Sequence, residues 1–190
     1  MNRTTKTLLT AGLMLTATAA SAHPGHGEGG FTSGLLHPML GLDHLLAMAA
    51  IGVWSMRQSK VMKRGTPLFM IVGMFLGAGL AFGGLSIPGV ETGIALSVML
   101  AGVLIATLAK LPTAVGGTLV AAFMVFHGFA HGAEMPAGAH FVTYMAGFGL
   151  ATLAIAFAGR GLGALLMKSD NRVSQAVGMA LAATGAFLAA

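Results

Sequence analysis

Six long apolar segments, separated by short polar breaks, make up most of the chain after its N-terminal part. A membrane-spanning helix needs about 20 apolar residues to cross about 30 Å of hydrocarbon, and each segment is close to that length. The breaks contain prolines and clusters of polar residues, which are typical of loops. The pattern predicts an all-α fold, a polytopic transmembrane bundle of six helices within residues 35–190. The predicted spans are residues 35–56, 66–86, 90–109, 112–131, 139–159 and 172–189.

The first 22 residues have the features of a secretory signal peptide. Arg3 and Lys6 form a basic start, an apolar stretch follows, and the small residues that end at Ala22 fit the cleavage rule. We therefore expect a signal peptide over residues 1–22 and, after its removal, a histidine- and glycine-rich periplasmic tail over residues 23–34. An uncleaved first helix is the alternative, and it would leave the topology of the remaining chain unchanged.

The basic side chains after the signal peptide all fall on one side of the predicted membrane. If the mature N-terminus lies outside, the loops alternate so that every Lys and Arg faces the cytoplasm, as the positive-inside rule requires. This pattern predicts a multi-pass protein of a bacterial inner membrane, with the N-terminus and the C-terminus of the mature chain in the periplasm. The basic residues concerned are Arg57, Lys60, Lys63, Arg64, Lys110, Arg160, Lys168 and Arg172.

The composition agrees with a membrane protein and excludes several other classes. With 56% hydrophobic and only 8% charged residues, the chain is far from the average of soluble proteins. The 29 glycines fit helices that pack through small side chains, such as Gly73 and Gly77 or Gly79 and Gly83. An assembly of several identical chains is left open. The net charge of +5 comes from scattered residues, so we expect no nucleic-acid partner. Without cysteine, any metal site must use nitrogen, oxygen or thioether sulfur.

The first predicted span carries three ionisable side chains, those of His37, Asp43 and His44. Such groups are costly within a membrane and therefore point to a functional role. In one continuous helix, His37 and His44 are seven residues apart and lie within about 20° of each other on one face. Asp43 points away from that face and could reach a neighbouring helix or orient a ligating imidazole. Pro38 either starts the helix or kinks the span.

The fourth predicted span ends with His127, His131 and Glu134, which share one stripe if the helix continues that far. Glu91, at the outer start of the third span, is placed to join them. Two imidazoles and a carboxylate suit a borderline divalent metal ion. A single histidine in a membrane helix can instead hydrogen-bond across a helix interface, but two such clusters at the same depth favour a metal site. The predicted metal ligands are His37, Asp43, His44, Glu91, His127, His131 and Glu134.

The inner half of the predicted bundle carries no ionisable side chain within a span. A path for an ion would there need Ser97, Thr107, Thr118, methionine sulfurs or backbone carbonyls. We interpret most of the 14 methionines as packing residues, and Trp54 and Tyr144 as packing or interfacial aromatics.

These motifs resemble those of the HupE/UreJ family, membrane proteins that are associated with nickel hydrogenases and ureases and regarded as nickel permeases. The resemblance implies transport of Ni²⁺ toward the maturation of a hydrogenase or urease. It also implies that residues of the first, third and fourth spans are important for activity. The ligands alone do not select the metal, because imidazole suits Ni, Cu, Zn and Fe alike, and cobalt also stays open. The matching residues are His37, Pro38, Gly41, Asp43, His44, Leu45, Leu46, Ala47, Met48, Gly52 and Trp54, then Pro88, Val90 and Glu91, then His127, Gly128, His131, Gly132 and Glu134.

The preferred function is a facilitator that takes up a divalent transition-metal ion, Ni²⁺ before others, as its substrate and holds no prosthetic group. No Walker-type phosphate loop is present, so we expect no ATP hydrolysis by this chain. A membrane potential of about 100 mV favours entry of a divalent ion by about 4.6 kcal/mol. A membrane metalloenzyme and a metal-binding sensor or chaperone without transport are the alternatives, and we expect the chain not to be an enzyme.

Overall fold

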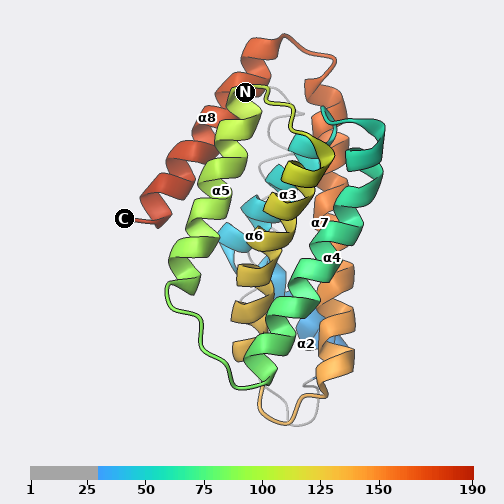
Figure 1. The fold of residues 1–190 in the computed structure, drawn as a ribbon, viewed down its shortest axis with the longest axis vertical. Coiled ribbons are helices and arrows are strands. Elements are labelled where there is room, and N and C mark those ends of the chain that lie inside the picture. Colours follow the sequence, from blue (N-terminus) through green and yellow to red (C-terminus); the bar gives the residue numbers. More distant parts are fainter. Residues whose placement is uncertain (1–29) are drawn as a thin grey trace, which may run out of the picture.

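The structure is a computed structural model that describes residues 30–190. The predicted signal peptide and residues 23–29 of the predicted tail lie outside the described residues. Every regular element in residues 30–190 is a helix, which confirms the all-α prediction (Figure 1). The elements are α2 (Phe31–Leu36), the 3₁₀ helix η2 (His37–Met39), α3 (Leu42–Ser55), α4 (Lys60–Phe82), α5 (Val90–Ala106), α6 (Thr113–Ala133), α7 (Phe141–Leu166) and α8 (Asn171–Leu188).

The helices form an up-and-down bundle in which α3, α4, α6 and α7 make the centre and α5 and α8 pair at one side (Figure 1). The most extensive contacts are between α4 and α6, followed by α5 with α8 and α3 with α7. The short helix α2 also packs on α7. The hydrophobic core is rich in methionine and aromatic side chains from the central helices.

The second to sixth predicted spans each contain one helix of the structure, and the first contains the end of α2, η2 and α3. By length and composition, α4, α6 and α7 can each cross a membrane, and α2, η2 and α3 together make a fourth span if they are one broken segment. The apolar helix α5 has 17 residues. The helices of the described chain therefore fit a helical membrane protein.

The first span is broken, so the prediction that His37 and His44 share one face of a continuous helix is wrong. The segments on either side of the break, Phe31–Met39 and Leu42–Ser55, are bent by 83°. Pro38 has no backbone N–H and its ring clashes with a continuing helix. Gly41 is extended, with φ −96 and ψ 115, and serves as the N-cap of α3. The helical region also begins at Phe31 rather than near residue 35.

Two glycines of α4 lie directly against the backbone of α6. A Cβ atom on Gly73 would lie 2.3 Å from the Ala121 carbonyl oxygen, and one on Gly77 would lie 2.0 Å from that of Val125. Gly79, in contrast, has no such neighbour within 4 Å. The close approach of α4 and α6 thus depends on the first glycine pair, as expected where helices associate through van der Waals packing in lipid.

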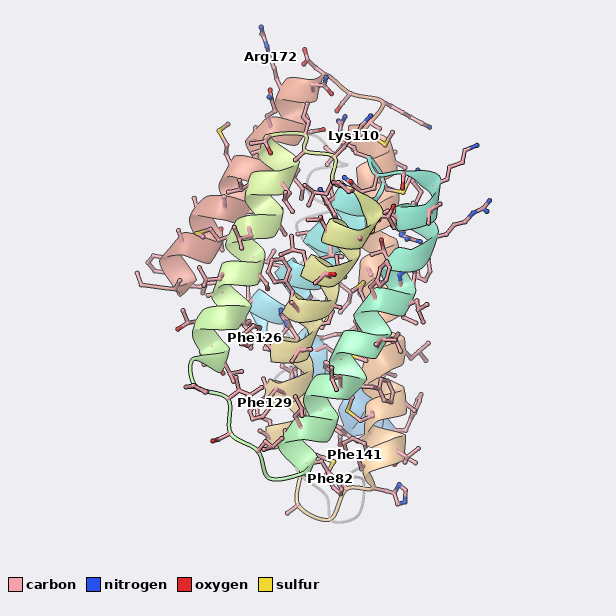
Figure 2. The ribbon with its side chains drawn as sticks, viewed as in Figure 1. Phe82, Lys110, Phe126, Phe129, Phe141 and Arg172 are labelled. Carbon is pink, nitrogen blue, oxygen red and sulfur yellow. The ribbon has the colours of Figure 1, made fainter. Side chains whose placement is uncertain are left out.

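The basic side chains collect at one end of the bundle, which we call the basic end. Figure 2 shows Lys110 and Arg172 at that end and Phe82 and Phe141 at the opposite end. The cause is the up-and-down order of the helices, which brings the α3–α4, α5–α6 and α7–α8 connections together. The predicted grouping of the basic residues on one side therefore agrees with the fold.

Hydrogen bonds connect neighbouring helices and loops at the basic end. The Trp54 indole and the Gln58 amide both donate to the Ala109 carbonyl oxygen, at 3.0 and 2.9 Å. Arg160 of α7 donates to the Lys63 carbonyl oxygen of α4 and, at 3.2 Å, to Ser55 Oγ of α3. The central helices are thus tied together at this end. Trp54, interpreted from the sequence as an interfacial or packing aromatic, is buried and also hydrogen-bonded.

Candidate metal site

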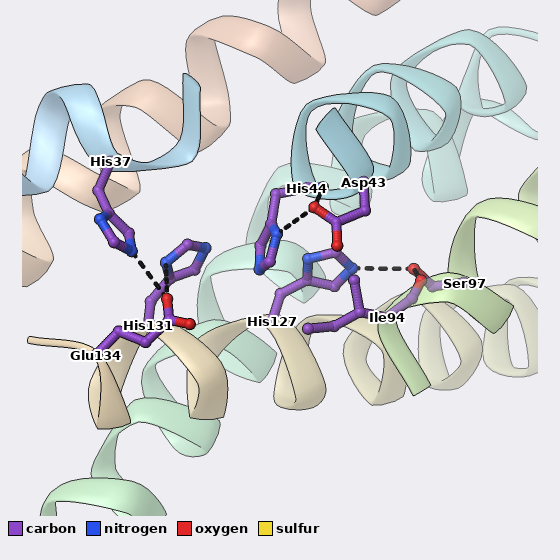
Figure 3. A network of polar contacts seen from close by, with 8 residues as sticks. All are labelled: His37, Asp43, His44, Ile94, Ser97, His127, His131 and Glu134. Atoms are coloured by element: carbon purple, nitrogen blue, oxygen red, sulfur yellow. Dashed lines mark hydrogen bonds and ion pairs between the residues drawn. The ribbon is translucent and has the colours of Figure 1, made fainter. Parts of the chain in front are cut away.

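Four histidine rings stand in a row (Figure 3). They lie in the half of the bundle opposite the basic end, because His127 and His131 are near the C-terminal end of α6, whose N-terminal end follows Lys110. The ring centroids of His37 and His131 are 4.6 Å apart, those of His131 and His44 are 4.2 Å apart, and those of His44 and His127 are 4.7 Å apart. We call this row the histidine ladder. It connects η2, α6 and α3, so residues distant in the sequence form one continuous set of nitrogen donors.

The local folding explains how the ladder forms. His127 and His131 are four residues apart in α6 and therefore lie on one face of that helix. His37 and His44 lie on the two sides of the break in the first span, one in η2 and the other in the first turn of α3. Both rings contact His131, because the bend turns the two segments toward the same face of α6.

The outer end of the ladder forms a partly exposed group that we call the outer triad: His37, His131 and Glu134. One ligand atom from each of these residues lies within 4.8 Å of the other two. His37 Nε2 is 3.0 Å and His131 Nδ1 is 3.9 Å from Glu134 Oε2. The side chains of His37 and Glu134 are 27% and 53% exposed, whereas that of His131 is 3% exposed. An ion could therefore reach this group from solvent.

Asp43 orients the ring of His44. Asp43 Oδ1 accepts a hydrogen bond from the His44 backbone N–H and lies 2.8 Å from His44 Nδ1. If Nδ1 carries the proton and donates it to the carboxylate, the lone pair on Nε2 is left for a ligand. The carboxylate can thus orient the imidazole through Nδ1 while Nε2 faces a ligand, which is one of the roles considered for Asp43 from the sequence.

Ser97 of α5 sets the opposite orientation for His127. Its Oγ donates to the Ile94 carbonyl oxygen at 2.7 Å and lies 2.9 Å from His127 Nε2. A hydroxyl has one proton to donate, so Ser97 must accept the second bond from His127 Nε2–H. The lone pair of the His127 ring is then on Nδ1. From the sequence, Ser97 was expected only on the inner path, because its contact with His127 depends on how α5 packs against α6.

Unpartnered nitrogens are concentrated in the ladder. His44 Nε2, His127 Nδ1 and both ring nitrogens of His131 are buried without a hydrogen-bond partner among the described residues. Buried polar atoms are usually hydrogen-bonded, and an unsatisfied one costs about 1–3 kcal/mol. The phenyl ring of Phe148 lies 4.0 Å from His131, which makes one wall of the row apolar. Such an arrangement suits a ligand that binds nitrogen lone pairs.

All but one of the predicted metal ligands belong to this region. Glu91 is exposed in the first turn of α5, away from the ladder, and is not one of the three residues of the outer triad, the group in residues 30–190 whose ligand atoms lie close enough to hold a metal ion. His140 is the exposed N-cap of α7, as expected for a histidine outside the site. Tyr144 and Phe148, which line the ladder, were not predicted as site residues. Their spacing of four residues in one predicted span was the signal that could have indicated a shared face.

Toward the basic end, buried methionine side chains follow the ladder. Met48 follows His44 by four residues in α3, and Met124 precedes His127 by three residues in α6, so both lie about one turn further in. Both side chains are 0% exposed. Thr118, considered from the sequence for the inner path, is exposed instead. In the described conformation, the side chains of His37 and Glu134 at the outer triad are thus partly exposed, whereas the two methionines beyond the ladder are buried.

Comparison with known proteins gives one consistent result. The family model described as HupE / UreJ protein matches residues 11–188. A relative named Protein HupE, from Rhizobium leguminosarum bv. viciae, is 38% identical over 170 residues that cover 89% of each chain. No solved structure matches the chain significantly. Because the family match and the similar relative both extend over most of the sequence, the chain belongs to the HupE/UreJ family.

Proposed function

We propose that the protein takes up divalent transition-metal ions, Ni²⁺ before others, across a bacterial inner membrane for the maturation of a hydrogenase or urease. The observation that carries the proposal is the histidine ladder, whose unpartnered nitrogens continue from a partly exposed triad to the buried ring of His127. The family is one of transporter-type accessory proteins rather than enzymes, which supports transport over a membrane metalloenzyme.

The ladder supports a stepwise path for the ion. The ion exchanges part of its water for His37, His131 and Glu134 at the outer triad. His131 then becomes the shared ligand, because its ring lies between those of His37 and His44. Centroid spacings of 4.2–4.7 Å let the ion gain a new nitrogen before it leaves the last one. Conduction requires sites that bind the ion well enough for it to enter, and weakly enough or in sufficient number for it to leave.

The donor set favours borderline ions. Imidazole nitrogen suits Ni²⁺, Co²⁺, Cu²⁺ and Zn²⁺, whereas Mg²⁺ and Ca²⁺ prefer sites made of oxygen. Among these ions we rank Ni²⁺ first as the transported substrate, because the family is associated with nickel enzymes. Co²⁺ is the second candidate.

Uptake by purified full-length protein in liposomes tests the proposed function. With a potential that is negative inside, we expect Ni²⁺ to accumulate at a rate that rises with the potential, since each 100 mV favours a divalent ion by about 4.6 kcal/mol. An excess of Mg²⁺ should leave the initial rate unchanged. The controls are empty liposomes and the variant His140→Ala, which changes an exposed histidine outside the candidate metal site. Binding of Ni²⁺ without accumulation would instead indicate a sensor or chaperone.

We further propose that the outer triad faces the periplasm and the basic end faces the cytoplasm, because this orientation obeys the positive-inside rule. Reporter fusions after Lys63 and after Lys168 should then report cytoplasm, and a fusion after Ala190 should report periplasm. The mature chain should begin at His23 if the signal peptide is removed, which N-terminal sequencing measures. A cytoplasmic C-terminus would contradict an even number of spans after a periplasmic start.

A further inference from the structure

The single tyrosine of the chain is buried in α7 with an unsatisfied hydroxyl. Its side chain is 0% exposed, and its Oη has no hydrogen-bond partner among residues 30–190. Five buried side-chain nitrogen and oxygen atoms of the described residues share this condition. Four of them belong to ladder histidines, and the fifth is Tyr144 Oη. The unsatisfied Tyr144 hydroxyl thus belongs to the same region as the unpartnered nitrogens of the ladder.

The position of Tyr144 relates it to the outer triad. Its ring centroid lies 6.0 Å from that of His37. Phe148, one turn further along α7 on the same face, contacts His131. The backbone of this turn is held in place by α2, because a Cβ atom on Gly34 would lie 2.0 Å from the Tyr144 carbonyl oxygen. Tyr144 is therefore carried by a segment of α7 whose backbone is fixed against α2, and its ring lies close to that of His37 in the triad.

The chemistry of a phenol limits what it can do there. A neutral tyrosine hydroxyl donates one hydrogen bond and accepts others. The outer triad supplies three ligand atoms, and a metal held by three protein ligands keeps a position for water. A water that is bound to a cation is a strong hydrogen-bond donor, because the charge of the ion polarises its O–H bonds. A buried, unpartnered phenol oxygen beside such a site is suited to accept that bond.

We propose that the Tyr144 hydroxyl positions a water molecule that the ion retains at the outer triad, so that this site receives a partly hydrated divalent ion. Tyr144 is thus a positioning residue for the hydrated substrate and does not ligate the metal. The inference rests on the proposed function, since it assumes that the triad binds the metal ion.

The proposal predicts effects of opposite sign on the metal-free and metal-bound protein. In the metal-free protein, Tyr144→Phe removes an unsatisfied buried hydroxyl and keeps the ring, so the melting temperature should stay the same or rise. In the metal-bound protein, the same change removes a hydrogen bond from the water ligand. The increase in melting temperature on adding Ni²⁺ should therefore become smaller. A hydroxyl with a purely structural role would lower the melting temperature of both forms.

The experiment uses full-length protein in detergent, with NiCl₂ as the probe. Titration calorimetry of Tyr144→Phe should show a Kd for Ni²⁺ about tenfold higher than that of the wild type, which corresponds to about 1.4 kcal/mol. The matched control is Thr143→Val, which removes an exposed hydroxyl in the same turn that is bonded to the His140 carbonyl oxygen. This control should bind Ni²⁺ with the wild-type Kd.

Several results would overturn the proposal. Equal Kd values for the wild type and Tyr144→Phe would remove the hydroxyl from the site and leave the proposed function intact. A wild type that binds no Ni²⁺ would refute both. The absorption spectrum of bound Co²⁺ provides the remaining distinction: the d–d bands should keep their positions in Tyr144→Phe. A charge-transfer band that is present in the wild type and lost in the variant would make Tyr144 a direct ligand and contradict the role in holding water.

Discussion

Replacing His131 with alanine is expected to lower the initial rate of Ni²⁺ uptake by at least about 100-fold. Losing a residue that merely supports a metal ligand costs about 10–100-fold, and His131 is proposed to be a ligand itself. Its ring lies between His37 and His44, so its loss interrupts the ladder in the middle. The amount of inserted protein should not change, because the imidazole has no hydrogen-bond partner among the described residues. His140→Ala should retain the wild-type rate.

A double-mutant comparison tests whether the ladder acts as one path. If His44 and His131 bind the same ion in turn, the combined loss in His44→Ala/His131→Ala should be much smaller than the product of the single losses. If both single variants are inactive, Asp43→Asn serves as the weaker change, since it removes the charge that orients His44. Losses in activation free energy that simply add would indicate separate binding stations and refute the shared path.

Replacing Gly128 with alanine is expected to have the largest effect on folding. A Cβ atom at this position would lie 1.9 Å from the Met74 carbonyl oxygen, so α6 would have to move away from α4. Overpacking a tight core costs about 1–3 kcal/mol, and a backbone obstacle places this variant at the upper end. Because His127 is the preceding residue, the shift would also displace the ladder. We expect a several-fold lower amount of membrane-inserted protein and a lower melting temperature in detergent.

Gly79→Ala is the matched control, because Gly79 is a glycine in the last turn of α4 and no neighbouring helix lies within 4 Å of its Cβ position. This variant should be as abundant as the wild type and should melt at the same temperature or higher, since alanine favours a helix more than glycine. If Gly128→Ala were as stable as Gly79→Ala, the close contact between α4 and α6 would not hold in the membrane.

The helices and their order were predictable from the sequence because the bilayer imposes a strong constraint. Every spanning segment must satisfy its own backbone hydrogen bonds over about 20 residues, which leaves a clear pattern of apolar runs and polar breaks. Each predicted span accordingly contains a helical segment, and all the basic residues after the signal peptide lie near one end. The pairing of His127 with His131 was also predictable, since it follows from helical spacing within one segment.

The break in the first span was less predictable. Pro38 allowed either a helix start or a kink, and the spacing of His37 and His44 fitted a continuous helix equally well. The bend is stabilised by partners distant in the sequence, such as α7, whose backbone lies against Gly34 and thereby holds α2 in place. The sequence assigned these histidines to one candidate site along a shared helix face, whereas in the structure a bend brings the rings of His37 and His44 to His131.

By itself, the sequence determined the fold class, the grouping of the basic residues and the residue types available to a metal, because these depend on local composition and on helical periodicity. Only the tertiary structure decided which nitrogens are free and which side chains surround them. Ser97 directs the lone pair of His127, Glu134 joins His37, and Glu91 is left exposed. Tyr144, whose ring centroid lies 6.0 Å from that of His37, has an unpartnered hydroxyl. These outcomes depend on how α2, α5, α6 and α7 pack together, and the contacts between separate helices leave no periodic pattern in a single chain.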